Sequence, residues 1–431
     1  MKKIAFLSVI LIAIIVLAVC FAGASGREGA SGDVSSALYV IAGRTQMAKS
    51  GLVGNTILFC ADDFEKNLNT SELVSITVTR VPEVTEGALY LGDMLVSAGL
   101  TVSHSNLDLL NYKSASKDIK TGSFDFKVNN SEYEITCALY LLDRKNSAPT
   151  VNMESERSLL VSTHQSTMVY GRVGAYDVDG DDIRIEVVSY PENGILEMDA
   201  LSGDYTYMPS GSYFGEDSFE YVAVDKYGNY SASQKVMLTV EKRKTDAVFC
   251  DMELHPAHHA ALTMTEKNIM SGTTIGEDVY FMPDMSVSRI DFLVMTMNAI
   301  GINDIQSVND TGFDDDNRIP TSMKGYVRRA RELGLISGSI DADGRLCFEP
   351  DRPITRAEAA LIVNKIVGGK VPVVKPVFAD KSDIPTWASD AIYSLNYLGI
   401  LPAENGNISP SAELTRAQTA HMLYELIATL K

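Results

Sequence analysis

Three arginines near the end of the chain stand at the second position of a short recurring motif. The motif is a hydroxyl residue, arginine, any residue, and then an acid or amide. Its copies are SRID at 288–291, TRAE at 355–358 and TRAQ at 415–418. Arg289, Arg356 and Arg416 follow one another at intervals of 67 and 60 residues, so the motif is periodic. A guanidinium presents a planar fork of N–H groups, which suits a carboxylate or a phosphate.

The remainder of the motif is explained by helix starts, but the arginine is not. The hydroxyl and the acid or amide three residues later form a capping box. The arginine lies in the first helical turn, where the helix dipole disfavours a cation by about 0.3–1 kcal/mol. We therefore expect each guanidinium to have a partner. Two alternatives remain open, an acidic ligand in an exposed cleft and an internal ion pair with an acid of a neighbouring repeat.

A second group of carboxylates lies in DVDGDD at residues 177–182, where Asp177, Asp179 and Asp181 could direct oxygens at one Ca²⁺. The segment is not an EF-hand loop, because glycine falls at position four and Val188 stands where the bidentate glutamate belongs. A solvated acidic turn is the alternative to a Ca²⁺ site. The HPAHH segment at 255–259 spaces two histidines for a helix face but brings no third ligand. No hydrolytic constellation stands out, and no cofactor is required.

Composition limits the partners. The 431 residues are 45% hydrophobic and 22% charged, as in folded proteins, and the length predicts two to four domains. The formal net charge of −19 disfavours a nucleic-acid partner. Cys60, Cys137, Cys250 and Cys347 are too sparse for a disulfide scaffold. Cys60 and Cys137 could pair, but we favour four unpaired thiols.

The beginning of the chain predicts export. Residues 1–24 have a cationic start, an apolar run and a small-residue cleavage site, which is typical of a signal peptide. A retained anchor and lipidation at Cys20 are the alternatives. Residues 25–36 are small and polar and predict a flexible linker. No later apolar run is long enough to span a membrane, so we expect the mature protein to be secreted without a membrane span.

The elements that follow fall into a β part and a helical part. Residues 37–145 and 150–241 show short alternating strands, which predict two β-sandwich modules. They repeat each other, because Gly87-Ala88-Leu89 corresponds to Gly194-Ile195-Leu196 and the SFDF at 123–126 corresponds to the SFEY at 218–221. Beyond residue 249 the apolar period becomes helical. Three helix-loop-helix units are predicted at 249–302, 313–368 and 378–431.

These segments resemble known families. Residues 150–241 are similar to bacterial cadherin-like or immunoglobulin-like surface repeats, and residues 37–145 are a degenerate copy. The three helical units each open on phenylalanine and an acid (FCD, FDD, FAD) and resemble tandem S-layer homology (SLH) repeats. This resemblance implies a multidomain chain, in which two all-β sandwiches precede an all-α, pseudo-threefold SLH bundle.

The SLH resemblance implies attachment to a pyruvylated secondary cell wall polysaccharide, in grooves that expose Arg289, Arg356 and Arg416. Trp387 matches an aromatic position of the family, which Pro256 and Ser322 fill in the first two repeats. We therefore expect a non-catalytic protein of the cell surface, whose sandwiches could contact other surface proteins. The alternatives are a wall-bound glycan or peptide hydrolase with its catalytic part in residues 38–143, and a Ca²⁺-dependent adhesion rod.

Overall fold

The computed structural model describes residues 46–70, 72–129, 131–152, 159–303, 305–369 and 375–430. The chain divides into two compact units, Met1–Asn146 and Ser147–Lys431. The signal peptide and the linker lie outside the described residues and stay predictions. Within the described ranges, no helix combines the length and the apolar character that a membrane crossing needs. All four described cysteines are free thiols, as we favoured.

The first unit is a β-sandwich with one short helix, α3 (Ala61–Leu68). One sheet has the order β1 (Gln46–Leu52), β9 (Glu134–Leu142), β8 (Thr121–Val128), β3 (Ser75–Arg80) and β6 (Thr101–Ser103). The other has the order β2 (Ile57–Leu58), β7 (Leu110–Ser114), β4 (Gly87–Leu91) and β5 (Met94–Leu95). Burial alternates along β8 and β9, and their inner residues join those of the second sheet in one apolar core.

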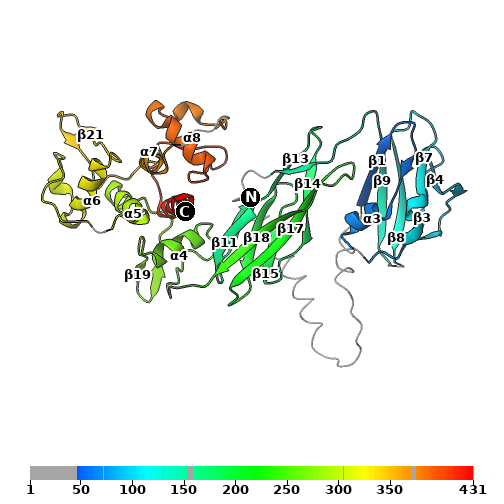
Figure 1. The fold of residues 1–431 in the computed structure, drawn as a ribbon, viewed down its shortest axis with the longest axis horizontal. Coiled ribbons are helices and arrows are strands. Elements are labelled where there is room, and N and C mark those ends of the chain that lie inside the picture. The colour runs from blue at the N-terminus through cyan, green and yellow to red at the C-terminus, as the bar shows by residue number, and fades with distance from the viewer. Residues whose placement is uncertain are drawn as a thin grey trace, which may run out of the picture. The chain divides into compact units, whose positions relative to one another are not determined.

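The second unit begins with another sandwich (Figure 1). Its larger sheet has the order β11 (Leu160–His164), β18 (Gln234–Glu241), β17 (Gly215–Asp225) and β14 (Ile183–Ser189). The smaller has the order β12 (Val169–Arg172), β16 (Asp204–Pro209) and β15 (Gly194–Met198). A separate pair joins β10 (Thr150–Asn152) to β13 (Gly174–Tyr176).

The two sandwiches share one topology. In each larger sheet the first strand pairs in parallel with the last (β1 with β9, β11 with β18), and the neighbouring pairs are antiparallel. The glycines predicted to correspond also share a role, because each leaves room for a tyrosine from the adjacent strand. A Cβ on Gly87 would lie 2.9 Å from Tyr112 Cε2, and one on Gly194 would lie 2.2 Å from Tyr207 Cε2. The predicted internal repeat therefore agrees with the observed strand order.

The rest of the second unit is helical. Its helices are α4 (His258–Glu266), α5 (Arg289–Ala299), α6 (Thr321–Glu332), α7 (Arg356–Val367), α8 (Ser389–Tyr397) and α9 (Arg416–Leu430). Small hairpins join the helices of the first two repeats, β19 (Thr273–Ile275) with β20 (Asp278–Tyr280) and β21 (Ser339–Ile340) with β22 (Leu346–Cys347). The second helix of each repeat packs on the first helix of the next: α5 on α6, α7 on α8, and α9 on α4. These three contacts arrange the repeats at 249–302, 313–368 and 378–431 in a closed ring.

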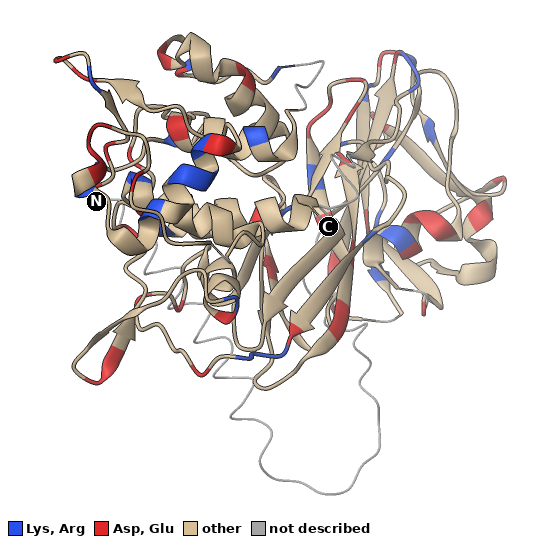
Figure 2. Ribbon diagram, turned by 60° about the vertical axis from the view of Figure 1, so that its left-hand side comes forward, with Lys and Arg blue, Asp and Glu red and all other residues tan. Residues whose placement is uncertain are grey.

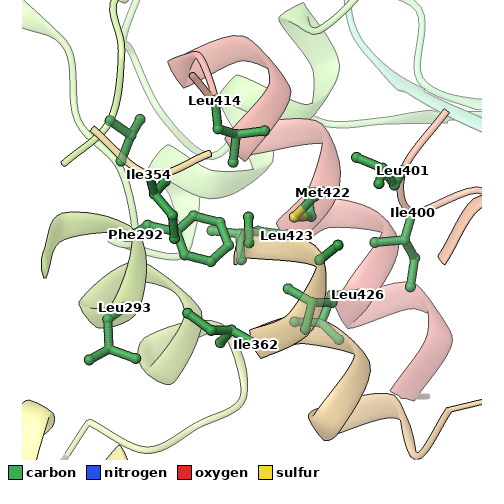
Figure 3. Close-up of a cluster of buried hydrophobic side chains, with 14 of the residues drawn as sticks. Phe292, Leu293, Ile354, Ile362, Ile400, Leu401, Leu414, Met422, Leu423 and Leu426 are labelled. Atoms are coloured by element: carbon green, nitrogen blue, oxygen red, sulfur yellow. The ribbon is translucent and has the colours of Figure 1, made fainter. Parts of the chain in front are cut away.

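One apolar core runs through all three repeats. Figure 3 shows side chains of α5, α7 and α9, such as Phe292, Ile362 and Leu423, meeting in its middle. The loops above them form a closed triangle of backbone hydrogen bonds. Val287 N donates to Leu414 O (3.0 Å), Leu414 N to Ile354 O (2.9 Å), and Ile354 N to Val287 O (3.0 Å). The predicted fold class, β-sandwiches followed by a pseudo-threefold helical bundle, is confirmed.

Candidate functional site between the helical repeats

Each motif arginine joins its repeat to the following one. The Nε atom of every one donates to a backbone carbonyl in the loop before the second helix of the neighbour. The pairs are Arg289 with Phe348 O (3.0 Å), Arg356 with Ile408 O (2.7 Å) and Arg416 with Phe281 O (2.7 Å). Two of them add a second carbonyl through Nη2, Arg356 to Pro402 (2.9 Å) and Arg416 to Ser271 (2.6 Å). These bonds follow the same circular order as the helix packing.

The expectation of exposed guanidiniums is therefore wrong for two of the three. Arg356 is 3% exposed, and the side chain of Arg289 is 12% exposed. Arg416 is partly buried. Burial lowers the pKa of all three guanidiniums, because the charged form loses solvation. The physical reason for the burial is that backbone carbonyls of the adjacent repeat have replaced water as acceptors.

One junction also contains the internal ion pair that the sequence offered as an alternative to an acidic ligand. Arg289 Nη1 lies 3.3 Å from Glu358, the acid of the second motif, and Arg352 holds both oxygens of that carboxylate. Burial opposes the charged form of Glu358, but the hydrogen bonds from Arg352 and from the backbone of Thr355, with the charge of Arg289, hold its pKa below the usual value. Glu358 also completes the predicted capping box with Thr355. The junction at Arg289 is thus already neutralised by the protein.

The aspartates near the start of each repeat position the carbonyls that the arginines bind. Each accepts hydrogen bonds from two successive backbone N–H groups of its own repeat's loop. They are Asp251 (Phe281 and Met282, 2.8 and 2.7 Å), Asp315 (Phe348 and Glu349, 2.8 and 2.7 Å) and Asp380 (Ile408 and Ser409, 3.0 and 2.6 Å). The second residue of each pair (Met282, Glu349 or Ser409) has a φ of +52 to +59°. This left-handed backbone conformation costs free energy in a residue other than glycine, and the hydrogen bonds to the aspartate stabilise it. The recurrence of this acid is visible in the sequence, but its role as an acceptor for the loop is not.

An open cleft lies between the third and first repeats. It has a volume of about 530 Å³, and Arg356, Glu404, Gln418, His421 and Tyr170 contribute to its lining. Among the described residues, the Nη1 atom of Arg356 has one polar contact, a long one with Glu404 (3.6 Å), whose side chain is 62% exposed. Glu404 also accepts a hydrogen bond from Gln418 (2.9 Å). A carboxylate ligand could displace Glu404 from Arg356, because the contact is long and the glutamate itself is mostly exposed to water.

Arg416 and Trp387 do not line this cleft. Arg416 contributes to the junction of the third repeat with the first repeat's loop, and its Nη1 has no partner among the described residues. Trp387, in the 3₁₀ turn Thr386–Ala388, is 56% exposed. Pro256 does not occupy the position of Trp387, because Pro256 and Pro385 each follow the opening phenylalanine of their repeat by seven residues, and Trp387 lies two residues further on. The position corresponding to Trp387 is therefore His258.

The acidic turn of the second sandwich is organised by hydrogen bonds. Asp177 Oδ1 accepts from Asp179 N (2.8 Å) and Asp181 N (3.4 Å), and Asp181 pairs with Lys226 (3.0 Å). Asp179 Oδ2 accepts from Ser147 N (2.8 Å). Nowhere in the described part of the chain do three His, Cys, Asp or Glu side chains gather closely enough for a metal ion. The structure therefore does not bring Asp177, Asp179 and Asp181 together as a ligand set.

The histidines of HPAHH separate rather than pairing. His255 lines the cleft at Arg356, whereas His259 Nδ1 lies 2.8 Å from Nδ1 of His164, which β11 of the sandwich provides. His164 is fully buried, and its Nε2 lies 3.3 Å from Glu266. Tyr424 of α9 packs against the ring of His259. This contact between the sandwich and the ring had no signal in the sequence of either part.

Comparison with protein families supports both resemblances. A family model described as bacterial cadherin-like domain matches residues 146–242, and the S-layer homology domain model matches residues 312–360 and 377–420. The chain therefore carries a bacterial cadherin-like domain followed by SLH repeats, and it is a cell-surface protein attached through the SLH repeats. Residues 249–302 lie outside the SLH matches, yet their helices α4 and α5 complete the same ring.

Solved structures resemble parts of the chain. Fibronectin(III)-like modules of Clostridium thermocellum CbhA are 13% identical over 47% of this chain and 94% of theirs, with a TM-score of 0.21. Human protocadherin-24 EC1-2 is 17% identical over 23% of this chain and 45% of its own (TM-score 0.19). Drosophila N-cadherin EC1-3 is 12% identical over 46% and 64% (TM-score 0.21). The chain spans 28% of an endo-fucoidan hydrolase of glycoside hydrolase family 107. No curated protein matches it.

Proposed function

We propose that the protein is a non-catalytic surface protein whose SLH ring binds a pyruvylated secondary cell wall polysaccharide. The observation that carries the proposal is the cleft between the third and first repeats. There Arg356 keeps one side of its guanidinium toward an exposed glutamate instead of a buried partner. A pyruvyl ketal carries a carboxylate, which can accept a charge-assisted hydrogen bond from Nη1 of Arg356, because Nε and Nη2 already donate to backbone carbonyls.

Arg416 and Trp387 are further contacts in this proposal. Arg416 retains an unpartnered Nη1 among the described residues, and Trp387 offers an exposed indole face to a sugar ring. Arg289 is the weakest candidate of the three arginines, because Glu358 already neutralises it. Nucleic acid is a poor partner, since Asp and Glu outnumber Lys and Arg by 56 to 37 and both kinds are interspersed over the fold (Figure 2).

The test is sedimentation of the whole protein with purified cell walls. Walls from which the pyruvyl groups have been removed serve as the reference, and we expect the protein to pellet only with untreated walls. Arg356→Lys keeps the charge but loses the forked geometry, so pelleting should fall about tenfold. Glu404→Gln removes the competing carboxylate and should strengthen binding.

The matched control is Arg328→Lys, on the outside of α6, where the side chain is 49% exposed. Thermal unfolding of each variant reports whether the ring is intact. Equal pelleting with both kinds of wall would overturn the carboxylate assignment. Turnover of wall glycans or peptides by the intact chain would overturn the non-catalytic part and favour a hydrolase with its catalytic part in residues 38–143.

A further inference from the structure

The cadherin-like domain contributes a side chain to the cleft at Arg356. Tyr170, on β12, lines that cleft together with residues of three SLH repeats, and it is 38% exposed. Its hydroxyl donates to Leu254 O over 2.7 Å, just before helix α4. The bond fixes the ring at the edge of the cleft, so that little side-chain entropy remains to be lost when a ligand contacts it.

The other lining groups fit a hydroxyl-rich molecule, because they include several hydrogen-bond donors and acceptors. His255 Nδ1 accepts from Ala257 N (3.1 Å), which leaves the proton of the neutral ring on Nε2 as a donor. His421 Nε2 lies 3.3 Å from Gly399 O and can donate to it, and its ring is a further polar group of the lining. Among the described lining residues Arg356 is the one guanidinium, the amide of Gln418 adds a donor and an acceptor, and the carboxylates of Glu404 and Asp284 add acceptors.

The domain is held against the ring by contacts outside the cleft as well. Glu266 of α4 accepts from Lys244 N (2.7 Å) and lies 3.3 Å from His164, and His164 meets His259 at 2.8 Å. Tyr170 is therefore not the single attachment of the domain. A substitution of its side chain can change the cleft while these other contacts keep the domain in place.

We infer that the wall-polymer site is composite, with Tyr170 of the cadherin-like domain stacking on a sugar ring whose carboxylate reaches Arg356. This inference rests on the proposed function and assigns the cadherin-like domain a direct part in attachment. An aromatic face is suited to the C–H surface of a sugar, and a pinned hydroxyl presents that face in one orientation. The neighbouring groups would then bind hydroxyls of the same residue.

The experiment is calorimetric titration of the full chain with a synthetic disaccharide carrying one pyruvyl ketal. The same disaccharide without the ketal is the reference. We expect Tyr170→Ala to weaken binding of the ketal form about tenfold. Tyr170→Phe keeps the ring face and should stay within about threefold of the unmodified chain. Tyr176→Ala removes a 54% exposed tyrosine of the same domain that does not line the cleft, and it should bind normally.

The outcomes separate the two proposals. No preference of the unmodified chain for the ketal form means that the proposed function fails. A normal preference with Tyr170→Ala within twofold of the unmodified chain means that the function stands and the composite site is wrong. If Tyr170→Phe falls as far as Tyr170→Ala, the hydroxyl bond to Leu254 matters rather than the ring face, and the stacking role is overturned. Thermal unfolding of each variant reports whether the cadherin-like domain remains folded.

Discussion

The sandwiches and the SLH ring are both built by repetition, but they differ in how many repeats are needed to close a core. Each sandwich surrounds an apolar cluster of its own. In the ring a single cluster passes through all three repeats, and the triangle of Val287, Ile354 and Leu414 needs one residue from each. A change in one sandwich core is therefore confined to that module, whereas a ring repeat is constrained by both neighbours.

The difference also decides where a binding site can form. A cleft between interlocked repeats has fixed walls, because the same backbone bonds that close the ring set the distance between its sides. The arginines illustrate the consequence. In Arg356 and Arg416, the Nε and Nη2 atoms donate to backbone carbonyls of the next repeat and so close the ring. The surroundings of the remaining nitrogen, Nη1, differ between the two junctions. Similar motifs in the three repeats thus do not give three equal sites.

The largest expected effect comes from removing one ring repeat. Deletion of residues 249–302 takes away α4, α5 and one corner of the backbone triangle, so we expect the helical part to lose its cooperative unfolding transition. Deletion of residues 1–146 should leave that transition unchanged, since this unit has its own core. Circular dichroism at 222 nm during heating measures both. A ring that still melts cooperatively without its first repeat would contradict the comparison.

The next effect is that of a closing arginine. Arg356→Met leaves the carbonyls of Ile408 and Pro402 without their donor in a buried place, which should cost about 3–5 kcal/mol of unfolding free energy. Arg328→Met changes the same charge on an exposed face and should leave stability unchanged. Urea unfolding of both variants gives the values. A loss below 1 kcal/mol for Arg356→Met would mean that the arginine does not close the ring.

The helical repeats could be predicted from sequence because their signals are local. The hydroxyl and the acid three residues later are a contiguous capping motif, and Thr355 with Glu358 forms it as expected. The burial of Arg356 could not be predicted in this way, because its acceptors are backbone carbonyls of another repeat. A carbonyl is present in every residue, so the sequence carries no mark of the one that is used.

Contacts between domains were equally hidden. Tyr170 lies in a predicted strand, where an exposed aromatic residue is common and does not indicate a binding site. Its hydrogen bond to Leu254 forms only because the sandwich docks on the helical ring. The acids in FCD, FDD and FAD were visible as a recurrence, but their role required the loop conformation that Asp251 and its counterparts hold. The recurrence of the acid could therefore be seen in the sequence, but the backbone N–H groups that it binds could not.

We expect acid to weaken the docking of the second sandwich on the helical ring. Burial lowers the pKa of His258 to about 4 and that of His259 to about 3. The charged and titratable side chains around them or around their partner His164 are Arg243, His164, His255, Glu266, Glu241 and Tyr424. Both imidazoles are neutral in the folded chain, so protonation favours the undocked or unfolded form.

Because these folded pKa values lie below the ordinary value of 6.5, the full stability is present above pH 6.5. It falls as the pH decreases from 6.5 toward 4 for His258 and toward 3 for His259, with a loss of about 2–4 kcal/mol by pH 5. Unfolding in urea at pH 7 and pH 5 measures the change. His259→Gln should reduce the pH dependence, and an unchanged dependence in that variant would show that another group is responsible.

The smallest effect tests the independence of the sandwiches. Gly87→Ala and Gly194→Ala each place a Cβ against a tyrosine ring and a backbone carbonyl, Lys113 O at 2.3 Å and Met208 O at 2.7 Å. We expect each variant to lose about 1–3 kcal/mol, because overpacking forces the strand or the ring to shift. The loss should be confined to the module that carries the change, since each tyrosine belongs to a separate core. Hydrogen exchange of the two modules distinguishes them, and reduced protection in both from either substitution would mean that the sandwiches unfold as one.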